Sequence, residues 1–222
     1  SIRTTARKNA DGSWTLNGEK IWITNGGIAQ VYTVFARTEG TDGKITAFVV
    51  EAGWAGVTHG SHEDKMGIRA SSTTVVGFAD VRVPAENLIG EEGRGFRYVL
   101  SGMNAERILI AAECIGDGRF LLERASQYAR ERHVFGRPIG QNQGIAHPLA
   151  RNWMELEAAH LMVHKAATLY DSGQPCAAEA NAAKYLGAEA CFRACESAMF
   201  THGGMGYAKE YHVERYLREA WI

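Results

Sequence analysis

The sequence lacks the features that mark several specialised classes of protein. Its 24 basic residues are balanced by 25 acidic ones, for a formal net charge of -1. This balance leaves no basic surface for nucleic acid and no polybasic arm for a membrane. No apolar run is long enough to span a bilayer, and no signal peptide is recognisable. We therefore expect a soluble protein with no nucleic-acid or membrane partner, in the cytoplasm or in an organelle matrix.

Patterns for disulfides and metal ions are also missing. The four cysteines show neither CxxC spacing nor a disulfide-rich arrangement, and they are Cys114, Cys176, Cys191 and Cys195. This usage predicts reduced thiols. The eight histidines form no HExxH motif, and no Cys/His cluster has the spacing of a zinc site. We expect no metal site.

What the chain does contain is enough apolar sequence for a sizeable core. Its 222 residues are 45% hydrophobic and 22% charged, which predicts two domains. The chain begins at Ser1 without a Met and stops at Ile222 within an apolar pattern. We expect these ends to be those of a piece of a longer polypeptide.

The first domain, residues 1–88, shows the period-two pattern of β-strands. Asn17 and Gly18 predict a two-residue hairpin turn between residues 14–16 and 19–24, because a type I′ turn needs positive φ at both positions. In the returning strand Ile21 and Ile23 should face one side, and Trp22 and Thr24 the other. Further strands are predicted at residues 30–38, 44–51, 57–61 and 72–83. Short strands without helices between them predict an antiparallel β sandwich or barrel.

The second domain, residues 89–222, begins with a linker and then has a helical period. Helices are predicted at residues 96–132, 143–171, 176–201 and 210–222, and Gly116 and Gly118 allow a break in the first. Residues 133–140 are predicted to be a loop. The fold class is therefore α+β, with an antiparallel helical bundle after the β domain.

One carboxylate stands among apolar residues in the first predicted helix. Met103, Ile110 and Ala111 can share a buried stripe that Glu106 and Arg107 flank. A carboxylate beside such a stripe loses hydration, so its pKa should rise, which suits removal of a proton from a weak carbon acid. The alternative, which the pattern alone favours, is an exposed Glu beside an exposed Arg on a solvated helix face.

Several motifs resemble the acyl-CoA dehydrogenase family of flavoproteins. They are residues 22–27 (WITNGG), 65–69 (KMGIR), 78–84 (FADVRVP), 132–139 (RHVFGRPI) and 202–207 (HGGMGY). They occur in the family's order along essentially the whole chain. The resemblance covers the family's middle β domain and C-terminal helical domain, and the N-terminal helical domain has no counterpart here.

The resemblance implies a set of residues that bind FAD. Trp22 would pack on the isoalloxazine ring, and Ile23 and Thr24 would donate toward its N5 edge. The alternative for Trp22 is an aromatic side chain that packs on a face of the sheet. Arg132, Val134 and Phe135 would contact the FAD of a neighbouring subunit, and Gln143 would be a further FAD contact. Gly203 and Gly204 would let the backbone approach the cofactor closely.

Two positions depart from the family's common pattern. Phe200 stands where many relatives have Gln, and Val134 replaces a common Thr or Ser. Each change removes a polar group that would contact FAD. Gly203 and Gly204 also have a simpler interpretation, because most such glycines only end helices.

The reaction implied is α,β-dehydrogenation of an acyl-CoA thioester to the trans-2-enoyl-CoA, as in fatty-acid β-oxidation. Glu106 would remove the α-proton while the β-hydride passes to flavin N5, since a minority of relatives carry the catalytic Glu directly before an Arg on this helix. Arg107 and Asn104 would contact the substrate. An electron-transfer flavoprotein or a similar acceptor, and a homodimer or homotetramer, are also implied.

Two other functions remain open at this point. An acyl-CoA oxidase or related flavin oxygenase would share these motifs but pass electrons to oxygen. A flavin-free interaction module is the second, because part of the FAD-binding surface has no counterpart in this chain.

Overall fold

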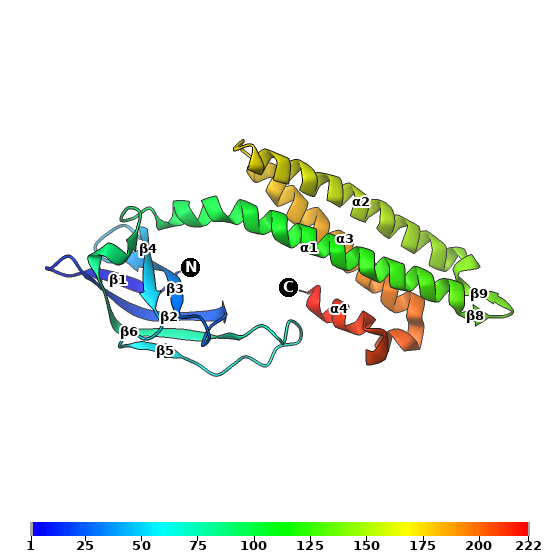
Figure 1. Ribbon diagram of the computed structural model, residues 1–222, viewed down its shortest axis with the longest axis horizontal. Coiled ribbons are helices and arrows are strands. Elements are labelled where there is room, and N and C mark those ends of the chain that lie inside the picture. The colour runs from blue at the N-terminus through cyan, green and yellow to red at the C-terminus, as the bar shows by residue number, and fades with distance from the viewer. Residues whose placement is uncertain (1, 222) are drawn as a thin grey trace. The chain divides into compact units, whose positions relative to one another are not determined.

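The computed structural model describes residues 2–221, which form two compact units that divide between Ser101 and Gly102 (Figure 1). The first unit is a β domain and the second is helical, which confirms the α+β fold class. The predicted boundary after residue 88 stays a prediction, because the helix that begins at Gly95 runs across the division between the units.

The β domain is built on one seven-stranded sheet with the order β5-β6-β2-β1-β3-β4-β7. Every pairing is antiparallel except that of β1 with β3, so the sheet is mostly of the predicted kind. Trp14 and Phe48 meet edge to face at 5.2 Å between ring centroids in its core. The strands are β1 Thr5–Lys8, β2 Trp14–Thr24, β3 Val31–Thr38, β4 Ile45–Glu51, β5 Val57–His59, β6 Thr73–Val83 and β7 Leu88–Ile89.

The predicted hairpin turn at Asn17 and Gly18 is wrong, because both residues lie inside the continuous strand β2. The register with β6 shifts between Leu16 and Gly18, so a β-bulge stands where a turn was expected. The Asn17 amide and Asp80 exchange two hydrogen bonds of 2.9 Å there. Gly18 has a φ of 127°, and a Cβ would lie 2.9 Å from the Cα of Thr4. The glycine thus serves a close strand approach.

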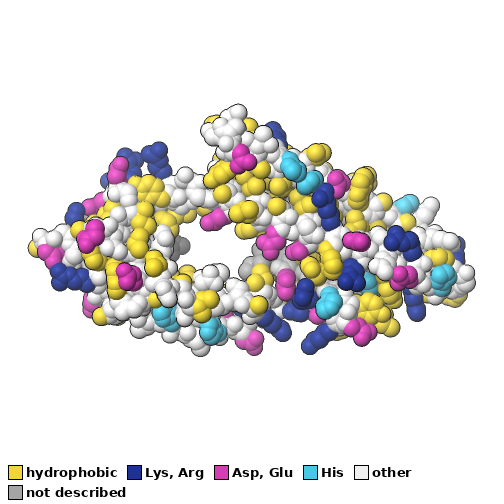
Figure 2. All heavy atoms as spheres, in the orientation of Figure 1, with side chains coloured by type: hydrophobic (Ala, Val, Ile, Leu, Met, Phe, Trp, Pro, Cys, Tyr) yellow, Lys and Arg dark blue, Asp and Glu magenta, His cyan; other side chains and the backbone are white. Residues whose placement is uncertain are grey.

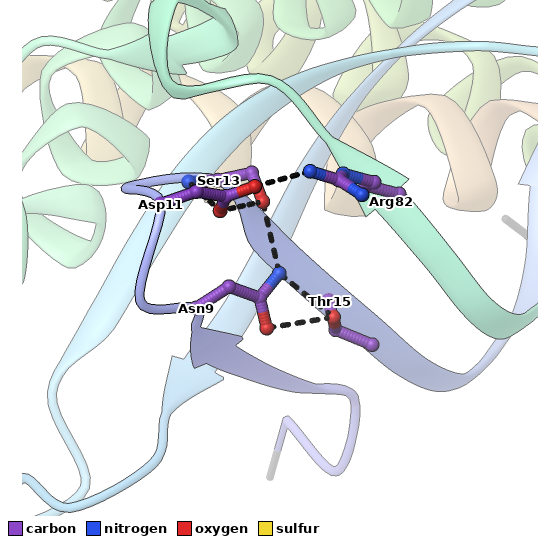
Figure 3. Close-up of polar contacts among 5 residues, drawn as sticks. All are labelled: Asn9, Asp11, Ser13, Thr15 and Arg82. Atoms are coloured by element: carbon purple, nitrogen blue, oxygen red, sulfur yellow. Dashed lines mark hydrogen bonds and ion pairs between the residues drawn. The ribbon is translucent and has the colours of Figure 1, made fainter.

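The first turn of the chain instead joins β1 to β2 and is closed by side chains (Figure 3). The Ser13 hydroxyl and amide both donate to Asp11 Oδ1, at 2.6 and 3.1 Å. Asn9 bonds both Ser13 and Thr15, and Arg82 of β6 forms an ion pair with Asp11. The hydrogen bonds from Ser13 are the main reason that the pKa of Asp11 is lowered.

Three long helices pack together in the second unit, and a short one follows (Figure 1). The predicted break in the first is wrong, because that helix is continuous over 37 residues. Gly118 is buried, and a Cβ there would lie 2.5 Å from Leu156, so this glycine allows close helix packing. His212, with a φ of 62°, precedes the short helix. The helices are α1 Gly95–Glu131, α2 Gln143–Asp171, α3 Ala177–His202 and α4 Val213–Glu219.

Short turns of 3-10 helix connect some of these strands and helices. Between β6 and β7 lies one turn of 3-10 helix, and three more follow in the second unit. They are η1 Ala85–Asn87, η2 Ile139–Gln141, η3 Gly203–Tyr207 and η4 Lys209–Tyr211.

Two absences hold for the described residues. None of the helices formed by residues 2–221 is both long and apolar enough to cross a membrane. Within the same residues, no three potential metal-ligating side chains come together.

Candidate functional site

Trp22 lies on a bulge near the end of β2. Pairing with β6 moves from Lys20 opposite Val76 directly to Ile23 opposite Thr74, so both Ile21 and Trp22 occupy the space of one residue. Trp22 has a φ of 57°, which is unusual for a bulky residue. The predicted alternation is therefore wrong at this point, because the bulge interrupts the period of two. Ile21 and Trp22 are both about 60% exposed, at 60% and 61%.

This conformation costs free energy that the surrounding strands must supply. A non-glycine residue in the left-handed region costs about 1–3 kcal/mol and is concentrated at functional sites. Here it holds an exposed indole next to Ile21, whose side chain is exposed as well. This surface suits a flat, largely apolar ring system, because the face of an indole and an apolar neighbour can pack against such a ring. Thr24 is exposed and Ile23 half-buried in the two following positions.

Glu106 lies on the exposed side of α1, and the predicted buried stripe is wrong at Ile110, whereas Ala111 is buried as predicted. The buried face of this part of the helix holds Ile108, Ala111 and Ile115, at the spacing of successive turns. Ile110 is instead 44% exposed. Since α-helical geometry puts residues 106, 109 and 110 on one side, Glu106 stands among exposed apolar side chains.

Arg107 and Asn104 are half-buried on the same helix. The guanidinium of Arg107 contacts the sulfur of Met103 at 3.8 Å. Within residues 2–221 it makes no ion pair, with Glu106 or any other acid. The Arg107 charge is therefore available to a ligand.

The segment predicted as a loop after α1 contains a small hairpin. Strands β8 His133–Val134 and β9 Arg137–Pro138 are joined by Phe135 and Gly136, whose φ values are 53° and 77°. Positive φ at both central residues is the geometry of a type I′ turn. Phe135 is fully exposed at the tip, and Arg132 is exposed at the base. Such an exposed aromatic on a rigid turn is suited to contact another molecule.

The remaining residues assigned to FAD by resemblance occupy helix ends. Gln143 is exposed at the first residue of α2, and the backbone nitrogen of Ile139 donates to the carbonyl oxygen of Arg132 at 2.9 Å. Gly203 follows α3 with a φ of 57°, and a Cβ at Gly203 or Gly204 would meet open space. Both glycines follow the end of α3, where the Gly203 amide donates to the carbonyls of Met199 and Phe200.

A buried histidine that sequence reasoning missed fixes the end of α3. His202 stacks on Tyr128 of α1, with 4.4 Å between ring centroids, and its Nδ1 donates to the Ala198 carbonyl at 2.8 Å. Burial lowers the pKa of His202, so the ring is neutral at pH 7. The contact holds the end of α3 against the end of α1, which leads into the β8–β9 hairpin (Figure 1).

Apolar side chains also remain exposed on the outer surfaces of both units (Figure 2). A groove of about 590 Å³ lies along α1, η2 and α2, with Leu122, Arg130 and Trp153 in its lining. None of the predicted site residues lines it. The groove nevertheless adjoins two of them along the chain, because Arg130 and Gln141 in its lining lie two residues from Arg132 and Gln143.

Comparison with known proteins bears on both units. Residues 1–81 match the family model described as acyl-CoA dehydrogenase, middle domain, and residues 93–222 match that of the C-terminal domain. A short-chain-specific acyl-CoA dehydrogenase of Megasphaera elsdenii is 44% identical in an alignment 222 residues long that covers 99% of this chain and 58% of that protein.

Solved structures agree with the family models. The structure of butyryl-CoA dehydrogenase from Megasphaera elsdenii has a TM-score of 0.95 at 43% identity, covering 100% of this chain and 58% of that one. An acyl-CoA dehydrogenase complexed with FAD from Bacillus anthracis has a TM-score of 0.90 at 33% identity, covering 100% and 41%. The chain thus spans less than two thirds of the length of these relatives.

Proposed function

The chain belongs to the acyl-CoA dehydrogenase family, and from that premise we propose that it acts in FAD-dependent α,β-dehydrogenation of an acyl-CoA thioester. The product would be the trans-2-enoyl-CoA, as in fatty-acid β-oxidation. The observation that carries the proposal is the strained, exposed Trp22 on the β2 bulge, at the position that the family resemblance assigns to the flavin.

When bound, FAD would supply the acceptor for the β-hydride. The residues of this chain would bind and orient it. The Trp22 indole would cover part of its ring, and Ile23 and Thr24 would offer backbone or hydroxyl donors beside that indole. The strained backbone at Trp22 supports this role, because strain of this kind is kept where a side chain must be presented in one direction.

The helical unit would contribute a second set of contacts, directed to the FAD of a neighbouring subunit. The Arg132 guanidinium suits a pyrophosphate, because five donors in a planar fork match phosphate oxygens. Phe135 and Val134 would add apolar contact at the hairpin, and Gln143 an amide. Gly203 and Gly204 would let backbone approach the cofactor, since neither position has a neighbour that a Cβ would meet.

Glu106 is proposed as the base that accepts the α-proton. Leu109 and Ile110 support this role, because they leave an apolar surface, 69% and 44% exposed, beside the carboxylate. An acyl chain laid on that surface would displace water from Glu106 and make it a stronger base. Arg107 and Asn104 would hold the polar end of the substrate.

Partners follow from the same proposal. Reduced FAD would be reoxidised by an electron-transfer flavoprotein or a similar acceptor, in the cytoplasm or in an organelle matrix. A homodimer or homotetramer is supported by the exposed apolar side chains on α2 and α3, among them Trp153, Leu161 and Tyr185, at 57%, 71% and 65% exposure.

A panel of acyl-CoAs added to the full-length protein without oxygen tests the proposal. Bleaching of the bound flavin by at least one acyl-CoA is the expected result, and slow reoxidation in air would separate a dehydrogenase from an oxidase. A yellow protein that no acyl-CoA bleaches would refute the proposed reaction. A colourless protein that gains no FAD on titration would favour an interaction module.

A further inference from the structure

The turn that follows Trp22 is held from both sides by the side chains of Tyr32 on β3 and of Ser72 just before β6. At residues 25–27 the chain leaves β2, and the Asn25 amide donates to the Ser72 carbonyl at 2.8 Å. Gly26 is buried, and its amide donates to the Ile23 carbonyl at 3.0 Å. A Cβ at Gly26 would lie 2.4 Å from the Thr74 hydroxyl, so the turn touches β6 directly.

Ser72 anchors the carbonyl of this turn. Its hydroxyl donates to the Gly26 carbonyl at 2.6 Å and lies 3.1 Å from Nδ1 of His62. Since the hydroxyl has one hydrogen, which goes to Gly26, His62 must donate from Nδ1 to the Ser72 oxygen. The result is a chain of donors from His62 through Ser72 to the turn.

Tyr32 anchors the amide of the same turn with the opposite polarity. Its phenol oxygen accepts from the Gly27 amide at 3.3 Å and lies 2.9 Å from Nε2 of His59. The hydroxyl also hydrogen-bonds His59, as donor or acceptor according to the tautomer of that ring. Tyr32 is 9% exposed, so the phenol is held within the β domain.

We infer that Ser72 and Tyr32 are positioning residues for the cofactor-facing segment of residues 22–24. They act through the turn at residues 25–27, and this inference rests on the proposed function. The bulge at Trp22 costs free energy, so the strand needs a fixed end to keep it. Hydrogen bonds to both the carbonyl of Gly26 and the amide of Gly27 supply that end.

The test compares two adjacent serines in the full-length protein. Ser72→Ala removes the hydroxyl that donates to the Gly26 carbonyl, whereas Ser72→Thr keeps a hydroxyl at the same position. Ser71→Ala is the matched control, because the Ser71 hydroxyl makes no hydrogen bond to any residue from 2 to 221. Tyr32→Phe removes the phenol oxygen and keeps the ring.

The primary measurement is the dissociation constant for FAD by fluorescence titration. Ser72→Ala and Tyr32→Phe should each weaken FAD binding about three- to tenfold, the effect of losing one hydrogen bond. Ser72→Thr and Ser71→Ala should stay within about twofold of the unmodified protein. Equal FAD binding by Ser72→Ala and Ser71→Ala would overturn the inference, as would a folded Ser72→Thr that fails to recover binding.

Hydrogen exchange without FAD separates this inference from the proposed function. The amides of Gly26 and Gly27 should exchange faster in Ser72→Ala than in Ser71→Ala, and an unchanged rate would count against the anchoring. Normal FAD binding with no reaction on any acyl-CoA would refute the function alone. The roles of Ser72 and Tyr32 would then stand on the binding and exchange results.

Discussion

Two glycines near the middle of α1 should respond differently to replacement by alanine. Gly118 is buried, and a Cβ there would lie 2.5 Å from Cδ2 of Leu156 on α2, a side chain with 0% exposure. Gly116 is exposed, and a Cβ there would meet nothing within 4 Å. The two positions share a helix but differ in their neighbours, so together they separate helix propensity from packing between helices.

The change in the free energy of unfolding can be worked out from the surroundings of each glycine. Both substitutions should gain about 0.5–1 kcal/mol, because alanine is the better helix former. At Gly118 the added methyl must also displace Leu156 in a packed core, at a cost of about 1–3 kcal/mol. The helix gain cancels in the comparison, so Gly116→Ala should be more stable than Gly118→Ala by about 1–3 kcal/mol. This difference corresponds to roughly 3–9 °C in Tm for a chain of this size.

Thermal and urea unfolding, followed by far-UV circular dichroism, measures this difference. Leu156→Ala supplies the control background, because a smaller side chain on α2 leaves room for the new methyl. In that background Gly118→Ala should lose most of its penalty, while Gly116→Ala should be unaffected. Equal Tm values for the two single variants would refute the claim that Gly118 is there for close packing of α1 on α2.

Three further outcomes are expected. Burial, and then the nearby Glu113 and Glu219, raise the pKa of Asp117, so its ionised form destabilises the folded state. Asp117→Asn should therefore raise the Tm at neutral pH. A series of Tm measurements against pH should show this advantage disappear below about pH 4, where the carboxyl is protonated in both states. Gly26→Ala should lower FAD retention on gel filtration at least threefold, because its Cβ would collide with a threonine hydroxyl of β6. Phe135→Asn should leave the unfolding free energy within about 0.5 kcal/mol while weakening FAD binding or subunit assembly, since the exposed ring touches little in the chain itself.

Regular elements could be predicted from the sequence because their periods were not interrupted. The helix predicted at residues 143–171 has the bounds observed for α2, where buried residues such as Leu149, Leu156 and Val163 recur on one face. Strands β3 and β4 also lie within a residue of their predicted bounds. In these segments local pattern and tertiary packing favour the same structure.

The missed features depend on partners that are distant in sequence. The bulges at Asn17 and Trp22 exist because of their register with β6, which begins at Thr73, so the dipeptide Asn17-Gly18 was mistaken for a turn. Gly118 was interpreted as a helix break because Leu156, which explains it, lies on another helix.

The candidate site was only partly accessible from sequence for a similar reason. Apolar residues surround Glu106 on the chain, but the position of α2 and α3 decides that Ile108 is buried and Ile110 is not. Ser72 and Tyr32, which anchor the turn after Trp22, were missed because both lie far from that turn in the sequence or on another strand. The roles of Trp22 and Glu106 themselves remain proposals.

The central claim is that the Glu106 carboxylate removes the substrate's α-proton. Stopped-flow reduction of bound FAD by an acyl-CoA, in full-length protein and in Glu106→Gln, tests it most directly. We expect that Glu106→Gln keeps FAD and binds the acyl-CoA but reduces flavin at least about 10²-fold more slowly, the usual contribution of a general base. Flavin reduction at an undiminished rate in Glu106→Gln would show that another group takes the proton.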